Sequence, residues 1–337
     1  MVIWIRFIAK VRVARTTLGR LLSAELTCNS STKRDTIIKN TCTSTSAKEM
    51  ADEEKIVRRN PHGDFKSIEA SRPAYDKSAE VYFTQTHSPN WKPGDGSNDN
   101  GECLQKSHIA IDPHEDGRPS VYNYKLLISA IVPRPIGFIS TRSADGSSTN
   151  IAPFSYFQTV NHDPPLFVVS FSGGLEQAKD TLRNLVETKE CVINIVSEHF
   201  IEAANATSTN APYGVSEWVL SGLTPADCCR VKSSRVKEAI FSIEGILVET
   251  KEFDSRAVPG KKSAVMAIIE GVQFWAREDA INDEKNLIDL KVLRPVSRFG
   301  GIMYGRTTQP FEIPRPDYNQ LIDEFGDELA KPKADGQ

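Results

Sequence analysis

The feature that most constrains this fold is a succession of short apolar runs, broken by turn residues, that begins near Val121. Residues 136–141 are rich in β-branched and aromatic side chains, Asp145-Gly146 suits a hairpin turn, and residues 149–154 can form the returning strand. The run at residues 166–171 is uninterrupted, which predicts a strand buried on both faces. Few helical segments lie between these runs to make parallel crossovers, so the pattern favours an antiparallel sheet.

The later part of the chain continues the same pattern. Further β-type runs occupy residues 191–196, 239–249 and 263–277. Residues 180–188 carry apolar side chains at helical spacing behind Asp180, which we expect to be the N-cap, and Ser197 can cap a second, short helix that runs through Ala204. The prediction is a mainly β fold with helical excursions, in the form of a six-stranded antiparallel barrel.

Composition divides the chain into four segments. Residues 1–49 carry nine Lys or Arg against three Asp or Glu, a bias typical of a mitochondrial transit peptide. Met50 is followed by ADEEK, an ordinary start for a cytoplasmic protein, so the leading segment is equally an untargeted tail. We expect residues 50–120 to be an extended polar arm outside the barrel with its isolated aromatics pinned to the folded surface, residues 121–310 to form the barrel, and residues 311–337 to be a tail.

Net charge and cysteine spacing argue against several classes of protein, namely nucleic-acid-binding, membrane, zinc-binding and disulfide-stabilised ones. The net charge of −3 gives no global attraction for nucleic acid or anionic membrane, and no apolar run approaches the ~18 residues needed to span a bilayer. The six cysteines show no CxxC spacing, which argues against a zinc site and a disulfide scaffold. We therefore expect no metal site and a cytoplasmic location, with a mitochondrial one as the alternative.

The triplet Lys179-Asp180-Thr181 is a candidate anion site. It stands at the start of the predicted helix, where unpaired N–H groups and the helix dipole favour a phosphate, and it adds a cation and a hydroxyl. Taken alone, the triplet is better explained by a helix capped by Asp180 with Lys179 as a solvated charge. Neither GxGxxG nor GxxxxGK[ST] occurs, so dinucleotide-binding and P-loop folds have no support.

Three segments resemble the flavin reductase-like family, the FMN-binding split barrel that includes flavoredoxins and related fungal proteins. They are the run PRPIGFISTRSADGSSTNIAPFSYFQTVNHDPPLFVVSFS, the KDT triplet with LRNL behind it, and RPVSRFGGIMYGR. The resemblance covers roughly residues 121–306 and implies an FMN-binding split β-barrel of Greek-key type that forms a homodimer.

The resemblance also implies the residues that hold FMN. Those near the phosphate and ring are Ser140, Thr141, Asn150, Ala152, Pro153, Phe154, Ser155, Ser170, Ser172, Lys179 and Thr181, while Arg298 and Tyr304 approach the ring or a neighbouring subunit. Backbone N–H groups can stabilise the reduced ring, although Pro153 removes one donor. No catalytic side chain is assigned, because hydride transfer to a flavin does not require a protein acid.

The leading hypothesis is an oxidoreductase that moves hydride from NADH or NADPH to FMN and on to a small-molecule acceptor or partner oxygenase. The alternative is a flavoredoxin-like electron carrier, or flavin-binding protein, without its own nicotinamide site. A third possibility, a barrel that lost its cofactor, is disfavoured by the intact KDT and NIAPFS segments.

Overall fold

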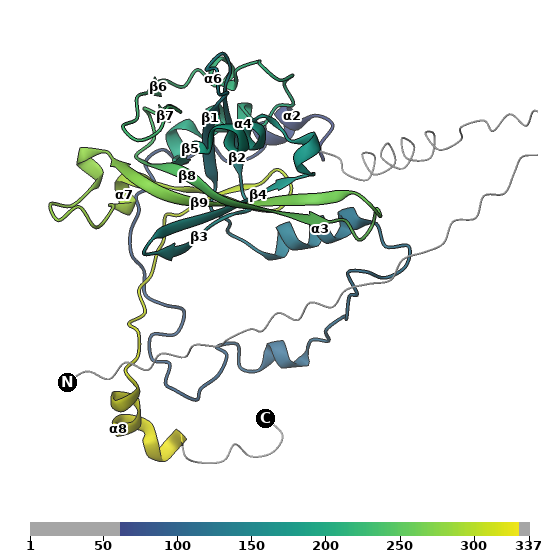
Figure 1. Ribbon diagram of the computed structural model, residues 1–337. Coiled ribbons are helices and arrows are strands. Elements are labelled where there is room, and N and C mark those ends of the chain that lie inside the picture. Colours follow the sequence, from purple (N-terminus) through teal and green to yellow (C-terminus); the bar gives the residue numbers. More distant parts are fainter. Residues whose placement is uncertain (1–60, 330–337) are drawn as a thin grey trace, which may run out of the picture. The chain divides into compact units, whose positions relative to one another are not determined.

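A seven-stranded antiparallel sheet forms the body of the computed structural model, which describes residues 61–329 (Figure 1). The predictions about residues 1–49 lie outside the described residues. In spatial order the strands are β2 (Thr149–Phe154), β1 (Gly137–Arg142), β5 (Glu190–Ile195), β8 (Phe241–Asp254), β9 (Lys262–Ala276), β4 (Pro165–Ser172) and β3 (Phe157–His162). The predicted strands are confirmed, with β8 and β9 joined as a long hairpin.

The sheet is closed by the chain itself. Its two edge strands, β2 and β3, follow one another in sequence and are joined only by Ser155 and Tyr156. The sheet must therefore curl until its edges approach, and the backbone N–H of Ser170 on β4 donates to the Tyr156 carbonyl at 2.9 Å beside this link. The split barrel is confirmed, but the prediction of six strands is wrong, because β3, which follows the bend after β2 and forms the opposite edge, was not predicted.

Two hydrophobic cores lie on the two faces of the sheet. One fills the barrel with side chains such as Ile139, Val169 and Ile193, and the other packs Phe138 and Ile151 against the helical side. Ile139 and Phe138 are neighbours on β1, so the strand sends alternate side chains into different cores.

This arrangement corrects one prediction about burial. β4 alternates between buried and half-buried side chains instead of being buried on both faces. Strands buried on both faces are instead the neighbouring central strands β1 and β5, whose consecutive side chains are buried. An uninterrupted apolar run thus did not distinguish β4 from these central strands.

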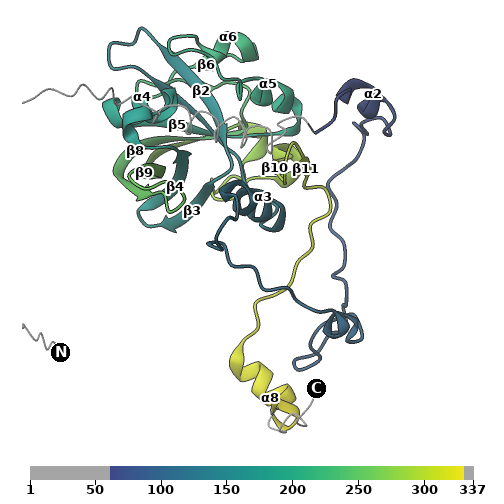
Figure 2. The same ribbon diagram turned by 90° about the vertical axis from the view of Figure 1, so that its right-hand side faces the viewer.

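Three helices, α4, α5 and α6, gather around β1 and β2 (Figure 2). The remaining elements of the barrel region are α3 (Ser120–Ala130), η2 (Leu175–Gln177), α4 (Asp180–Thr188), η3 (Glu198–Phe200), α5 (Ile201–Ala206), α6 (Glu217–Ser221), β6 (Pro225–Ala226), β7 (Arg235–Val236), η4 (Glu278–Ala280), α7 (Leu290–Leu293), β10 (Val296–Arg298) and β11 (Tyr304–Arg306). The α4 helix contributes Leu182 and Leu185 to the barrel core, which explains its apolar spacing.

The starts of two predicted helices differ from expectation. The N-cap of α4 is Lys179, with extended backbone, and Asp180 is the first helical residue. No side chain caps this end, so the N–H groups of its first turn have no capping partner. At the second helix, Ser197 precedes a 3₁₀ turn and makes no capping hydrogen bond.

Short elements interrupt the polar arm and the tail, namely α2 (Phe65–Ala70), η1 (Glu102–Gln105) and α8 (Tyr318–Leu329). The backbone N–H groups of Tyr82 and Thr84 donate to the carbonyls of Thr308 and Pro310, at 3.1 and 3.0 Å, so part of the arm pairs with the chain that follows β11. Of the predicted pinning aromatics, Tyr75 and Tyr82 make hydrogen bonds to the folded part. The others, Phe65, Phe83 and Trp91, have exposed side chains.

Candidate functional site

A cavity of about 220 Å³ opens beside the end of the edge strand β2. Five residues predicted from the sequence line it, namely Pro153, Phe154, Ser155, Arg298 and Tyr304. The structure thus brings together the NIAPFS segment and the RFGGIMYGR segment, which lie about 150 residues apart. The cavity is smaller than the ~300–1,000 Å³ typical of ligand pockets, so the walls present here enclose only part of a ligand.

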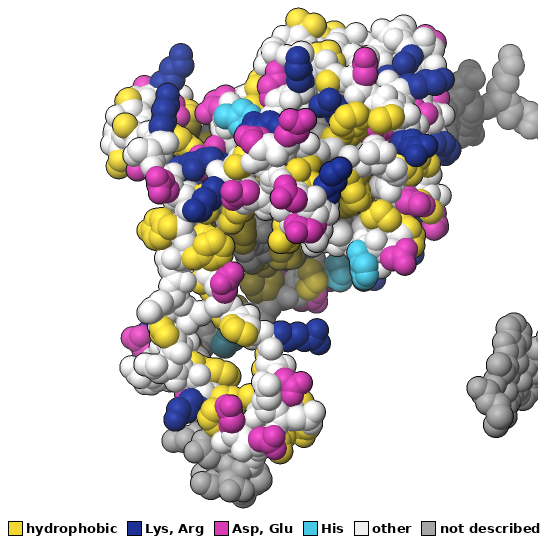
Figure 3. Space-filling model, turned by 90° about the vertical axis from the view of Figure 1, so that its left-hand side faces the viewer, with side chains coloured by type: hydrophobic (Ala, Val, Ile, Leu, Met, Phe, Trp, Pro, Cys, Tyr) yellow, Lys and Arg dark blue, Asp and Glu magenta, His cyan; other side chains and the backbone are white. Residues whose placement is uncertain are grey.

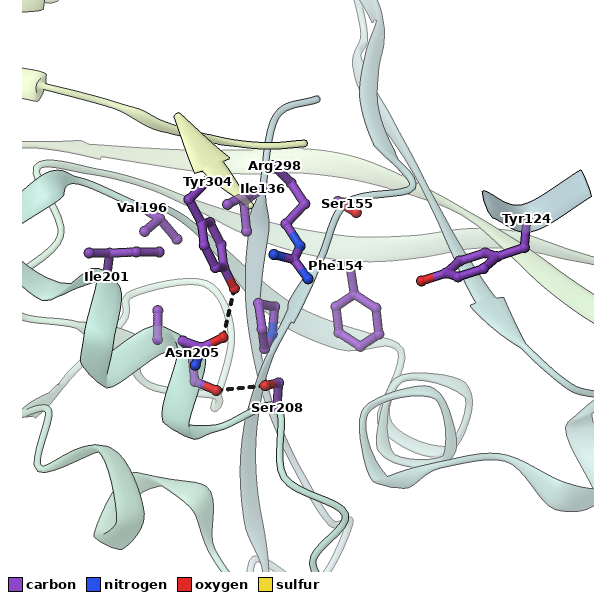
Figure 4. Close-up of a pocket in the computed structure, with 12 residues that line it drawn as sticks. Tyr124, Ile136, Phe154, Ser155, Val196, Ile201, Asn205, Ser208, Arg298 and Tyr304 are labelled. Atoms are coloured by element: carbon purple, nitrogen blue, oxygen red, sulfur yellow. Dashed lines mark hydrogen bonds between the residues drawn. The ribbon is translucent and has the colours of Figure 1, made fainter. Parts of the chain in front are cut away.

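Tyr304 and Asn205 form a fixed polar wall of this cavity (Figure 4). The Tyr304 hydroxyl donates to Asn205 Oδ1 at 2.8 Å, and the Ser208 hydroxyl donates to the Asn205 carbonyl at 2.6 Å. Burial raises the pKa of Tyr304, so its phenol stays protonated and keeps donating at neutral pH. Asn205 and Ser208 were not predicted, because a polar residue near the end of a short helix carries no sequence signal.

Arg298 lies over the Tyr304 ring, with its guanidinium carbon 4.4 Å from the ring centre. Its guanidinium donates to the carbonyls of Gly301 and Met303 at 2.6 and 3.3 Å, in the turn between β10 and β11. Much of the donor capacity of Arg298 is therefore used to fold this hairpin, which carries Tyr304 to the cavity.

The β2 strand offers a free backbone edge to the cavity. It pairs only with β1 on one side, and residues 152–155 are half-buried. Pro153, which cannot donate to a ladder, is tolerated because β2 is an edge strand. Unpaired backbone groups on such an edge can bind a planar heterocycle that presents its own donors and acceptors.

The start of α4 forms a second candidate region. Lys179 and Ser172 are exposed and Ser170 is half-buried, and Lys179 makes no ion pair with any residue in the described range. The loop before the helix is held in place, since the backbone N–H of Leu175 donates to Glu252 Oε1 at 2.9 Å. A positive side chain and uncapped N–H groups suit an anion.

Four predicted site residues are buried instead, namely Ser140, Thr141, Asn150 and Thr181. The Ser140 hydroxyl donates to the carbonyl of Ser234, while Thr141 accepts from Asn184 at 3.3 Å. The Thr181 hydroxyl donates to Asn150 Oδ1 at 2.6 Å. The hydrogen bonds of Ser140 and Thr181 use the single proton of each hydroxyl, and the contacts of all four residues with FMN stay predictions.

Glu217 completes this buried network. Its side chain accepts from Asn150 Nδ2 at 3.0 Å, and the residue is 5% exposed. Burial raises the pKa of Glu217, and the nearby charge of Asp180 adds to the rise. The spacing of 67 residues between Asn150 and Glu217 hides this contact from sequence reasoning.

The charged side chains on one face of the molecule are mixed in sign. On the face drawn in Figure 3, basic and acidic side chains are interspersed and form no broad field of one sign. Within residues 61–329, no helix is long and apolar enough to cross a membrane.

Comparisons with known proteins agree with this architecture. The model of the flavin reductase like domain matches residues 129–291. An uncharacterized protein of Aquifex aeolicus is 38% identical over 183 residues, which is 54% of this chain and 88% of that relative.

Among solved structures, nitrilotriacetate monooxygenase component B from Bacillus cereus is 32% identical, with a TM-score of 0.58, over 62% of this chain and all of that chain. The 2-nitrobenzoate 2-nitroreductase of Pseudomonas fluorescens is 27% identical, with a TM-score of 0.55, over 63% of this chain and 98% of that one. The barrel, its closure through β2 and β3, and these matches lead to one conclusion: the chain belongs to the flavin reductase-like domain family.

Proposed function

We propose that this chain binds FMN and transfers hydride from NADH or NADPH to the flavin, which passes electrons to a small-molecule acceptor or a partner oxygenase. The observation that carries the proposal is the layout of the edge strand β2. Its start contacts the first turn of α4 through Asn150 and Thr181, and its end lines the cavity through Pro153, Phe154 and Ser155.

The residues fit a flavin mononucleotide. The four steps of extended strand from Asn150 to Phe154 span about 13 Å, which leaves room for the ribityl chain between a ring in the cavity and a phosphate at α4. The half-buried β2 edge can hold the ring, and Lys179 with the uncapped helix start can hold the phosphate. When bound, the flavin supplies the hydride-accepting chemistry, while the protein binds and orients it.

Two relatives support the two proposed kinds of electron acceptor. The Bacillus cereus relative is named as one component of a monooxygenase, which favours a partner oxygenase as acceptor. The Pseudomonas relative is named as a nitroreductase, which favours a small organic acceptor.

The test is spectroscopic. The purified protein should be yellow and should bleach anaerobically with NADH or NADPH at a rate suited to turnover. Bleaching only in the presence of a separate reductase would indicate the flavoredoxin-like carrier instead, and a colourless protein that binds no added FMN would refute the proposal.

We further propose a homodimer whose second subunit completes the flavin site. The small, open cavity supports this proposal, as do the exposed Tyr124 and Tyr156 near it. Sedimentation should give twice the chain mass of 37.4 kDa. A monomer that still binds FMN would contradict this arrangement.

A further inference from the structure

Glu217 has no role in the proposed hydride transfer, yet it is a buried carboxyl linked to the start of α4. The α6 helix holds it against β2, where Asn150 Nδ2 donates to its Oε2 at 3.0 Å. Asn150 Oδ1 in turn accepts from the Thr181 hydroxyl at 2.6 Å. A continuous chain of hydrogen bonds therefore joins a titratable group to the second residue of α4.

The direction of this chain depends on the protonation of Glu217. An ionised carboxylate only accepts, so the Asn150 amide must turn its nitrogen toward Glu217 and its oxygen toward Thr181. The single hydroxyl proton of Thr181 is then used in the hydrogen bond to Asn150 Oδ1 and is not available to a ligand. A protonated Glu217 can donate to the amide oxygen; the turned amide then donates to the Thr181 oxygen and releases the Thr181 proton for another acceptor.

We propose that Glu217 is a positioning residue that couples a proton to phosphate binding, so that FMN binds with uptake of one proton by Glu217. The inference rests on the proposed placement of the FMN phosphate at α4. Proton uptake turns the Thr181 hydroxyl into a donor and removes a negative charge near the phosphate.

The surroundings of Glu217 suit this role. The β2 strand has no ionisable side chain, α5 has only the exposed Glu202, and α6 itself has no other ionisable group. Burial and, to a smaller extent, the negative charge of Asp180 on α4 raise the pKa of Glu217, and they outweigh the hydrogen bonds from Asn150 and from the backbone of Ile151 and Glu217, which lower it. Both influences favour the protonated form, as does an incoming phosphate dianion.

The expected pH dependence of FMN binding follows from the direction of the pKa shift of Glu217. Because binding raises the pKa of Glu217 further, FMN affinity increases as the pH falls through that pKa. Riboflavin lacks the phosphate and should show no such dependence. Since the FMN phosphate itself titrates near pH ~6, the protein variants must separate the two effects.

The decisive variant is Glu217→Gln, measured by fluorescence titration of the apoprotein with FMN and with riboflavin. Glutamine has the shape of the protonated acid and, unlike the carboxylate, can donate to Asn150 at every pH. At pH ~8, FMN should therefore bind about 3- to 10-fold more tightly than to the parent protein, and riboflavin should bind equally to both. Unchanged thermal melting confirms that the variant folds.

Thr181→Val supplies the matched control, because it keeps the shape and removes the hydroxyl. It should weaken FMN but not riboflavin, and adding Glu217→Gln to it should have no further effect on FMN. If Thr181→Val leaves FMN affinity unchanged, the Thr181 hydroxyl does not reach the phosphate and the coupling is refuted, whereas the placement of the phosphate at α4 is tested separately by Lys179→Glu. If Thr181→Val weakens FMN alone while Glu217→Gln gives no gain at pH ~8, the placement stands and the coupling is refuted.

Discussion

Glu198 on η3 joins the arm, the segment between α7 and β10, and β11, and its replacement is the sharpest test of the packing. The carboxylate is 8% exposed and accepts from Arg294 at 2.8 Å and Arg306 at 3.0 Å. The Tyr75 hydroxyl of the arm donates to it as well, and Arg306 lies over the Tyr75 ring. Glu198→Gln keeps the shape and one acceptor oxygen but removes the charge.

The expected cost can be worked from these contacts. Breaking a fully buried ion pair costs about 3–5 kcal/mol. The two guanidiniums here are 26% and 25% exposed, so water partly compensates for the lost charge. We expect Glu198→Gln to lower the free energy of unfolding by about 2–3 kcal/mol at neutral pH.

The pH dependence gives a second readout. Burial alone would raise the pKa of Glu198, but the hydrogen bonds from Tyr75, Arg306 and Arg294 outweigh it and hold the pKa below its usual value. A lowered carboxyl pKa stabilises the fold above the unfolded pKa of about 4.3, and this contribution is lost as the pH falls through the folded pKa. The stabilities of parent and variant should therefore converge at acid pH.

Urea unfolding at several pH values measures both effects. Glu202→Gln, which removes an exposed charge on α5, is the matched control and should change stability by less than about 0.5 kcal/mol. Equal stability of parent and Glu198→Gln at neutral pH, or a difference that persists unchanged into acid, would refute the assignment of Glu198 as an ionised anchor.

Three further substitutions test the site and the core. Lys179→Glu should weaken FMN on the order of 10- to 100-fold and leave riboflavin unchanged in fluorescence titrations; equal weakening of both flavins would assign the lysine to the fold. Tyr304→Phe removes the hydrogen bond to Asn205 and should weaken FMN and riboflavin alike, by about 3- to 10-fold; unchanged binding of both would place the ring elsewhere. Gly245→Ala would put a Cβ 2.5 Å from Ile269 Cγ2 inside the barrel and should lower the free energy of unfolding by about 1–3 kcal/mol, measured by thermal unfolding. A melting temperature equal to that of the parent would show that Ile269 can move to make room for the methyl group.

Local pattern was enough to predict much of the barrel. Alternation and β-branched content predicted most strands of the sheet, and the apolar spacing of residues 180–188 predicted α4. These signals could be found because the period of a strand or a helix appears in residues that are close in the sequence. The α3 helix escaped prediction, since its sequence SVYNYKLLISA leaves several apolar side chains exposed and has no clear amphipathic period. Resemblance, rather than pattern, led to the prediction of which segments face a flavin.

Only the tertiary structure decided which hydrogen-bond partners the polar residues have. From sequence, Asn150 and Thr181 were two candidate ligands of a phosphate, whereas in the fold they bond to each other and to Glu217. Tyr304 gained its partner Asn205 from a position 99 residues away. Hydrogen bonds of this kind depend on which distant surfaces the barrel closure brings together, and a buried polar group must find its partner there because water is absent. The sequence by itself therefore determined six of the seven strands of the sheet and the family, while the fold determined which hydroxyls bond to buried partners and which side chains line the cavity.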